Sequence, residues 1–137
     1  MDHKLTVRIS SFSFKKGYPK DESGNGGGYV FDCRFLNNPG RYDEYKALTG
    51  LDAPVIEFLQ TKSDIDKFVD DAYKIIDKAI ENYTERGFSS LQVNFGCTGG
   101  QHRSVYSAEK LGKMIKENWP EVNVKVCHIE QDIEKEL

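Results

Sequence analysis

One stretch constrains the fold of this chain more than any other, a glycine-bearing loop, Gly96–Ser104, between a strand-like run and a helix-like run. The preceding residues, Leu91–Phe95, alternate apolar and polar side chains as a half-buried strand does, and apolar residues recur with helical spacing from Val105 onward. A strand that passes through such a loop into a helix directs several backbone N–H groups, and the positive end of the helix dipole, at one point. The sequence therefore predicts an anion site at the carboxyl end of a strand, where ligands bind in open α/β sheets.

The composition fits a soluble globular domain and excludes several other classes of protein. The chain has 137 residues, of which 38% are hydrophobic and 30% charged, and its formal net charge of −3 gives no support to nucleic-acid binding. Its N-terminus lacks the apolar core of a signal peptide, and no run is long enough to span a membrane. The odd number of cysteines favours reduced thiols. We therefore expect one cytoplasmic domain over residues 1–137.

The hydrophobic pattern predicts an α/β fold with a small, mainly parallel sheet flanked by helices. Strand-like alternation is found in four runs: residues 5–14, 29–36, 91–95 and 122–126. The clearest helix begins at Ser63, where Asp66 would complete a capping box, and it stops at Gly87. A second helix, from Val105, connects the last two strands, which are therefore expected to run parallel.

The remaining segments have weaker patterns. Residues 15–28 end in a run rich in glycine and predict a flexible loop within the domain. Short helices are expected near residues 43–48 and 54–59. The acidic tail, residues 129–137, is expected to form a short helix.

Within the loop, Cys97 is followed at Cys-x5-Arg-Ser spacing by Arg103 and Ser104. An arginine offers phosphate a bidentate pair of donors, and Gly99 and Gly100 allow the backbone to approach a ligand closely. The residues that we expect at the ligand are these and their neighbours, together with two from the second strand: Cys97, Thr98, Gly99, Gly100, His102, Arg103, Ser104, Asp32 and Arg34.

Two interpretations of Cys97 remain open. A helix N-terminus and a nearby arginine lower the pKa of a thiol, so Cys97 could attack phosphorus as in cysteine-dependent phosphatases, whose motif is His-Cys-x5-Arg-Ser/Thr. Gly96 occupies the position of that histidine, and the spacing singles out none of Asp32, Asp43 and Asp52 as a general acid. The alternative is a cysteine that lines the pocket without attacking.

Other polar residues near the loop also have more than one interpretation. His102 could contact the ligand, act as an acid or be a polar residue of the first helical turn, and no second His or Cys stands at metal-ligand spacing. Asp32 and Arg34 share one face of their strand, so they either reach a common pocket or pair with each other.

Several motifs, in one order along the chain, resemble the C-terminal domain of the RapZ family: residues 13–19, 30–39, 48–52 and 96–105. The resemblance extends from Ile9 to His128. It implies a domain like a phosphofructokinase subdomain that binds glucosamine-6-phosphate and is regulatory rather than catalytic. It also implies that the loop residues listed above, Gly100 aside, form the phosphate site, with Asp32 and Arg34 beside it. Enterobacterial members also bind small regulatory RNAs and present them to an endoribonuclease.

The chain departs from this family at three points. It has no Gly-x4-Gly-Lys-Ser/Thr motif, so the ATP binding of the family's N-terminal P-loop domain is not expected, nor is a cofactor. Acidic residues follow His128 where RNA-binding members have basic ones, and acid opposes binding to a phosphate backbone. Gly40 stands where members have a ligand-facing histidine, which leaves the sugar open.

The sequence thus predicts a non-catalytic module that recognises a phosphorylated small molecule such as an amino-sugar phosphate. It would act on a protein partner in sugar metabolism, for example a kinase or a nucleotidyltransferase. The alternatives are a cysteine phosphatase with Cys97 as its nucleophile and an RNA-binding adaptor.

Overall fold

Four parallel strands and one antiparallel strand form the sheet of this protein, in the order β2-β3-β1-β4-β5. The computed structural model describes residues 4–20 and 28–137. The strands are β1 (Thr6–Ser13), β2 (Tyr29–Asp32), β3 (Ser90–Cys97), β4 (Asn123–His128) and β5 (Ile133–Glu136). The helices are α1 (Ala53–Lys62), α2 (Ile65–Glu85) and α3 (Arg103–Asn118). The prediction of an α/β fold with a mainly parallel sheet and flanking helices is confirmed.

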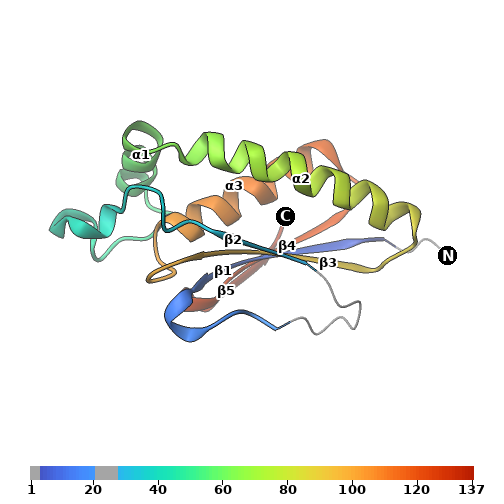
Figure 1. The fold of residues 1–137 in the computed structure, drawn as a ribbon, viewed down its shortest axis with the longest axis horizontal. Helices are drawn as coiled ribbons and strands as arrows, with labels where there is room; N and C mark the ends of the chain where they lie inside the picture. Colours follow the sequence, from blue (N-terminus) through green and yellow to red (C-terminus); the bar gives the residue numbers. More distant parts are fainter. Residues whose placement is uncertain (1–3, 21–27) are drawn as a thin grey trace.

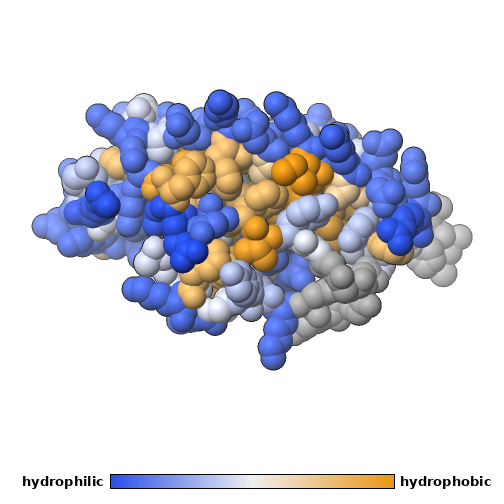
Figure 2. All heavy atoms as spheres, in the orientation of Figure 1, coloured by the Kyte–Doolittle hydropathy of each residue, from blue (hydrophilic) through white to orange (hydrophobic). Residues whose placement is uncertain are grey.

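Helices α2 and α3 lie along the same face of the sheet, and α1 lies beyond the end where β3 leads into the loop (Figure 1). The strand pattern explains this arrangement, because Val7 and Ile9 are fully buried whereas Arg8 between them is exposed. Figure 2 shows apolar side chains gathered in a band across the middle of one face, where Figure 1 draws α2 above β2. The ring of Phe68 on α2 packs edge-on against Phe31 and Phe95 of the sheet.

Two predicted elements differ from the structure, one because of a local turn and one because of pairing with a distant strand. β2 ends at Asp32 rather than at Leu36, since the chain turns and the N–H of Leu36 donates to the carbonyl of Cys33. The acidic tail forms no α-helix. It makes one 3₁₀ turn and then becomes β5, which pairs antiparallel with β4 after Asp132 takes a left-handed conformation with φ of 55°.

The long helix α2 begins without the predicted capping box. Its N-cap is Asp64, and the hydroxyl of Ser63 accepts from the N–H of Ile65 instead. The carboxylate of Asp66 is used elsewhere, as the acceptor for a tyrosine of α3. The predicted stop is confirmed, because Gly87 follows the helix with φ of 71°.

The remaining short elements are single turns. The predicted helix near residues 43–48 is a 3₁₀ turn, Asp43–Tyr45. The expected flexible loop of residues 15–28 begins within another 3₁₀ turn, Phe14–Lys16, and residues 21–27 of it lie outside the described residues. No helix in the described part of the chain combines the length and the apolar character that crossing a membrane requires.

Candidate anion-binding site

Carbonyl groups of the loop between β3 and α3 accept hydrogen bonds from neighbouring segments of the chain. The carbonyl of Thr98 accepts from the hydroxyl of Ser13 at 2.6 Å, and that of Gly100 accepts from the side-chain amide of Gln131 at 3.1 Å. None of the backbone N–H groups of residues 98–104 finds an acceptor among the described residues. The loop therefore has free N–H donors while the carbonyls of Thr98 and Gly100 are already engaged, which is the polarity that an anion requires.

A neighbouring segment fixes the shape of this loop. The side-chain amide of Gln101 donates to the carbonyls of Lys46 and Leu48 at 2.6 and 2.7 Å. In return, the N–H of Gly50 donates to the carbonyl of Gln101 at 2.9 Å. A Cβ at position 50 would lie only 2.3 Å from the carbonyl oxygen of His102, so this contact needs a glycine. The loop is thus held in place before any ligand binds.

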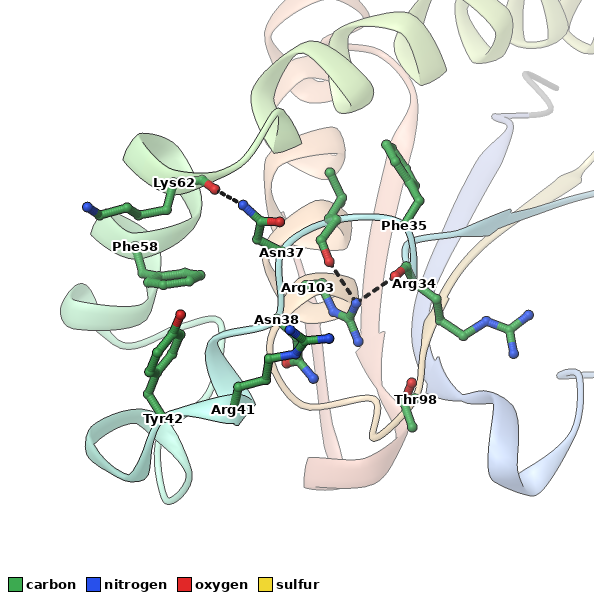
Figure 3. Close-up of a pocket in the computed structure, with 11 residues that line it drawn as sticks. Arg34, Phe35, Asn37, Asn38, Arg41, Tyr42, Phe58, Lys62, Thr98 and Arg103 are labelled. Carbon is green, nitrogen blue, oxygen red and sulfur yellow. Dashed lines mark hydrogen bonds between the residues drawn. The ribbon is translucent and has the colours of Figure 1, made fainter.

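Arg103, the first residue of α3, is the best-placed cation of the site. Its side chain is buried, with 4% of its surface exposed, and its Nη1 donates to the carbonyls of Arg34 and Leu36 at 3.0 and 2.9 Å. Its buried Nε has no hydrogen-bond partner among the described residues. Figure 3 shows the guanidinium between Thr98 and Arg41, where it borders a cavity. The arginine is anchored at one nitrogen and has donors left for a ligand.

That cavity has a volume of about 520 Å³. It is lined by residues of the turn after β2, of α1 and of the loop: Arg34, Phe35, Leu36, Asn37, Asn38, Arg41, Tyr42, Phe58, Lys62, Thr98 and Arg103. Four of these are cationic, and no carboxylate is among the described lining residues. In Figure 3 the guanidinium of Arg41 turns toward Asn38 and Arg103, whereas the ammonium of Lys62 points away. Two positive groups, the guanidinium groups of Arg41 and Arg103, are thus brought together in a protein of net charge −3.

Asp32 and Arg34, whose roles the sequence left open, pair with each other. Their closest nitrogen and oxygen lie 2.6 Å apart, and hydrogen bonds from the Arg34 side chain lower the pKa of the Asp32 carboxyl. The Arg34 guanidinium also stacks over the ring of Phe14 at 4.0 Å and points away from the cavity (Figure 3). Only the other atoms of Arg34, including the carbonyl that holds Arg103, serve the site.

The loop cysteine faces the core instead of the cavity. Cys97 is 2% exposed, its sulfur lies 3.1 Å from the hydroxyl oxygen of Ser104, and it is absent from the cavity lining. His102 is also buried, and its Nε2 is 2.9 Å from the carbonyl oxygen of Tyr45. Of the nine expected residues, three line the cavity, Arg34, Thr98 and Arg103. The other six are absent from its lining: Asp32, Cys97, Gly99, Gly100, His102 and Ser104.

Among the described residues, none of the three aspartates considered as a general acid lines the cavity. Asp43 pairs with Lys46 on the surface, and Asp52 accepts from the N–H of Thr49 at 2.7 Å. The described residues also contain no group of three or more His, Cys, Asp and Glu side chains that could hold a metal ion. The arrangement can bind an anion, and within residues 4–20 and 28–137 the structure places no carboxyl group beside it.

Sequence reasoning missed Arg41, Asn38 and the aromatic pair Tyr42 and Phe58, whose ring centroids are 5.7 Å apart at one wall. One signal was present, since Asn-Pro-Gly before Arg41 predicts a turn that exposes the next side chain. The Asn38 side chain does cap this turn, accepting from the N–H of Gly40 at 2.9 Å. The aromatic wall had no such signal, because it joins residues from separate elements.

Comparison with known proteins gives a consistent result. The family model described as RapZ C-terminal domain matches residues 5–132. A nucleotide-binding protein of Pseudoalteromonas translucida is 41% identical over 131 residues, which are 96% of this chain and 44% of that protein. One from Thermotoga neapolitana is 38% identical over 131 residues, 96% of this chain and 43% of that protein. The chain thus spans less than half the length of these curated relatives.

Proposed function

The chain belongs to the RapZ C-terminal domain family, and from this membership and the geometry of the loop we propose that it recognises a phosphorylated small molecule without cleaving it. The ligand that we propose is an amino-sugar phosphate such as glucosamine-6-phosphate. The buried cysteines, all of them free, fit a reducing compartment, so we propose that the module acts in the cytoplasm on a protein partner in sugar metabolism.

One observation carries this proposal, the partly satisfied guanidinium of Arg103 at the wall of a cationic cavity. The Nη2 group of Arg103 forms no hydrogen bond with the described residues and is not among the buried unpaired atoms, so it is free to donate a charge-assisted hydrogen bond to an anion in the cavity. The anchored Nη1 holds the guanidinium in place, so little entropy is lost when a phosphate binds. The unpaired N–H groups of the loop supply further donors to the same anion.

Recognition is favoured over cleavage because the thiol and the phosphate would lie on opposite sides of the loop. The Cys97 sulfur faces the core, and no described residue of the cavity lining has a carboxyl group that could protonate a leaving oxygen. The name of the longer relatives refers to nucleotide binding. Because the present sequence has no P-loop motif, we propose that their nucleotide site lies outside the region that they share with this chain.

The direct test is a nuclear magnetic resonance titration of the labelled 137-residue chain with glucosamine-6-phosphate. We expect the largest amide shifts at residues 96–104, since those N–H groups would face the phosphate. Glucosamine, which lacks the phosphate, should cause much smaller shifts at the same concentrations. Shifts confined to other parts of the chain would contradict the proposal.

A pair of arginine variants tests the proposed phosphate contact. Arg103→Lys keeps the charge but loses the planar set of donors, so affinity for glucosamine-6-phosphate should fall by about tenfold or more, the range of one charge-assisted hydrogen bond. Arg86→Lys is the matched control, because Arg86 follows the far end of α2 and stacks on Phe88. Equal affinity for both variants would exclude Arg103 as the phosphate ligand.

A further inference from the structure

A second cavity, of about 590 Å³, lies on the other side of the first turns of α3. Its walls come from the segment before α1, from α1, from the start of α2, from α3 and from β5: Gly50, Leu51, Ile56, Gln60, Asp66, Tyr106, Glu109, Lys110, Lys113 and Lys135. It shares no lining residue with the cavity beside Arg103. Nothing in the proposed function uses it.

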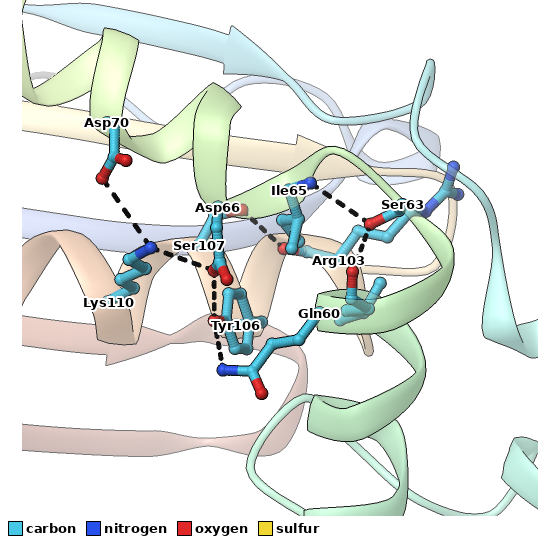
Figure 4. Close-up of polar contacts among 10 residues, drawn as sticks. Gln60, Ser63, Ile65, Asp66, Asp70, Arg103, Tyr106, Ser107 and Lys110 are labelled. Carbon is cyan, nitrogen blue, oxygen red and sulfur yellow. Dashed lines mark hydrogen bonds and ion pairs between the residues drawn. The ribbon is translucent and has the colours of Figure 1, made fainter.

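The two carboxylates of this cavity are already neutralised by neighbours. Asp66 accepts a hydrogen bond from the Tyr106 hydroxyl at 2.5 Å and pairs with Lys110 at 3.0 Å (Figure 4). Glu109 pairs with Lys135 at 2.5 Å and lies 2.8 Å from the buried Nε2 of His128. These pairs leave neither carboxylate as a free counter-charge for a cationic ligand.

One cation of the cavity is left over. The ammonium group of Lys113 forms no ion pair with any carboxylate of the described chain, and Lys113 is exposed at the rim. Lys110 pairs with both Asp66 and Asp70, and Lys135 pairs with Glu109, so Lys113 is the lysine of the described lining that lacks a carboxylate partner. A ligand with a single negative charge complements this lysine.

The rest of the lining is suited to an apolar body. Two apolar side chains of the lining are in contact with water: Leu51 is 37% exposed, and Ile56 is only partly buried. The hydroxyl of Tyr106 is held between Asp66 and the amide of Gln60, as Figure 4 shows, so its ring is fixed as part of the wall. A small aliphatic or aromatic group would cover these surfaces and remove them from water.

We propose that this cavity is a second ligand site, which binds a small amphipathic carboxylate. The carboxylate pairs with Lys113, and the apolar body lies against Leu51 and Ile56. The site is separate from the anion-binding loop and does not depend on the function proposed for it.

The test uses 4-methylpentanoate as the probe, titrated into the labelled full chain at low ionic strength. We expect amide shifts at residues 50–60 and 106–113. Two partial analogues should each bind at least fivefold more weakly than 4-methylpentanoate. Acetate has the carboxylate but not the branched hydrocarbon chain, and 4-methylpentan-1-ol has the hydrocarbon chain but not the charge. Absence of shifts at these residues, equal binding of the three compounds, or shifts centred on residues 97–104 would overturn the proposal.

A matched pair of variants separates the site from general attraction to lysines. Lys113→Gln should weaken 4-methylpentanoate binding by about threefold or more and leave the affinity for the alcohol unchanged. Lys78→Gln changes an exposed lysine on α2 outside this lining and should leave both affinities unchanged. Wild-type affinity of Lys113→Gln for the carboxylate would overturn the proposal.

Discussion

The sulfur of Cys97 lies 3.1 Å from the hydroxyl oxygen of Ser104, and both side chains are buried behind the loop. In a cysteine phosphatase the serine of this motif would support a thiolate that attacks from within the cavity. Here the pair instead closes the core beneath the first turn of α3, because Cys97 packs with apolar residues of the sheet and helices. The motif therefore combines the spacing of a phosphatase with the orientation of a structural cysteine.

This orientation predicts that the protein does not hydrolyse aryl phosphates between pH 5 and 8. Cys97→Ser should keep its affinity for glucosamine-6-phosphate within about twofold, since the thiol does not line the cavity. Release of nitrophenol from p-nitrophenyl phosphate measures the first expectation and calorimetric titration the second. Turnover that disappears in Cys97→Ser would show that the thiol is a nucleophile.

A second prediction concerns the contact between Gly50 and the loop. Gly50→Ala would place a methyl group 2.3 Å from the carbonyl oxygen of His102 and 2.6 Å from the backbone nitrogen of Tyr106. Because two backbone segments must move apart, we expect the free energy of unfolding to fall by about 1–3 kcal/mol. Urea denaturation measures this loss.

The control for this substitution is Gly99→Ala, which lies in the loop that Gly50 contacts. A Cβ at position 99 meets no atom within 4 Å, and Gly99 has no positive φ. Its stability should therefore remain within about 0.5 kcal/mol of the wild type, as for an unstrained surface position. Similar losses in the two variants would mean that the loop tolerates no side chain at all, irrespective of the contact at Gly50.

Local patterns in the sequence were sufficient to locate the four parallel strands, although not the end of β2, and to locate the loop and the long helix. The alternation around Val7 and Ile9, and the glycine stop at Gly87, depend on neighbours in the chain and were predicted correctly. The helix predicted for the acidic tail was wrong because the conformation of the tail depends on residues far away in the chain. Its conformation is decided by pairing with β4 and by the ion pair from Lys135 to Glu109, neither of which leaves a periodic signal.

The candidate site was also predictable only where it depends on local sequence. The spacing of Cys97 and Arg103 predicted the loop, but spacing does not determine which side chain faces the cavity. Arg103 is fixed by carbonyls 67 and 69 residues earlier in the chain, at Leu36 and Arg34. Arg41 joins it only because the Asn-Pro-Gly turn folds back beside α1. Such contacts become visible only when the sheet is assembled.

A third prediction concerns the alkaline limit of stability. Burial, together with the hydrogen bond to Asp66, raises the pKa of Tyr106 to about 12. In the unfolded chain this phenol ionises near its ordinary value of about 10, so the folded state loses stability as the pH rises from there toward 12. Tyr106→Phe should be less stable by about 1 kcal/mol at pH 8, and the difference should shrink above pH 10.

Denaturation of wild type and Tyr106→Phe in parallel from pH 8 to 11.5 measures this change, and the difference cancels the titration of lysines. The absorbance of tyrosinate at 295 nm provides an independent check. Compared with the wild type, Tyr106→Phe should have one tyrosine fewer that ionises near pH 12. A stability difference that stays constant across this range would show that Tyr106 has an ordinary pKa.

The fourth prediction concerns the acid limit and the buried end of α3. Burial of Glu109 opposes its ionisation, but hydrogen bonds from His128 and Lys135 outweigh it, and the pKa of the carboxyl is lowered. His128 also lies 2.7 Å from the Ser11 hydroxyl, so this carboxylate holds together α3, β1, β4 and β5. Glu109→Gln should therefore reduce the free energy of unfolding by about 1–3 kcal/mol at pH 7.

The sign of the pH dependence distinguishes this carboxylate from a surface one. Because the unfolded chain takes up the proton first, the stabilisation from Glu109 is present above the ordinary carboxyl pKa and is lost as the pH falls below it. The gap between wild type and Glu109→Gln should thus narrow from pH 5 to pH 3 in urea denaturation. Glu117→Gln, at an exposed position of the same helix, is the control and should follow the wild type throughout. A gap that widens toward pH 3 would mean that the buried carboxyl is protonated in the native state at neutral pH.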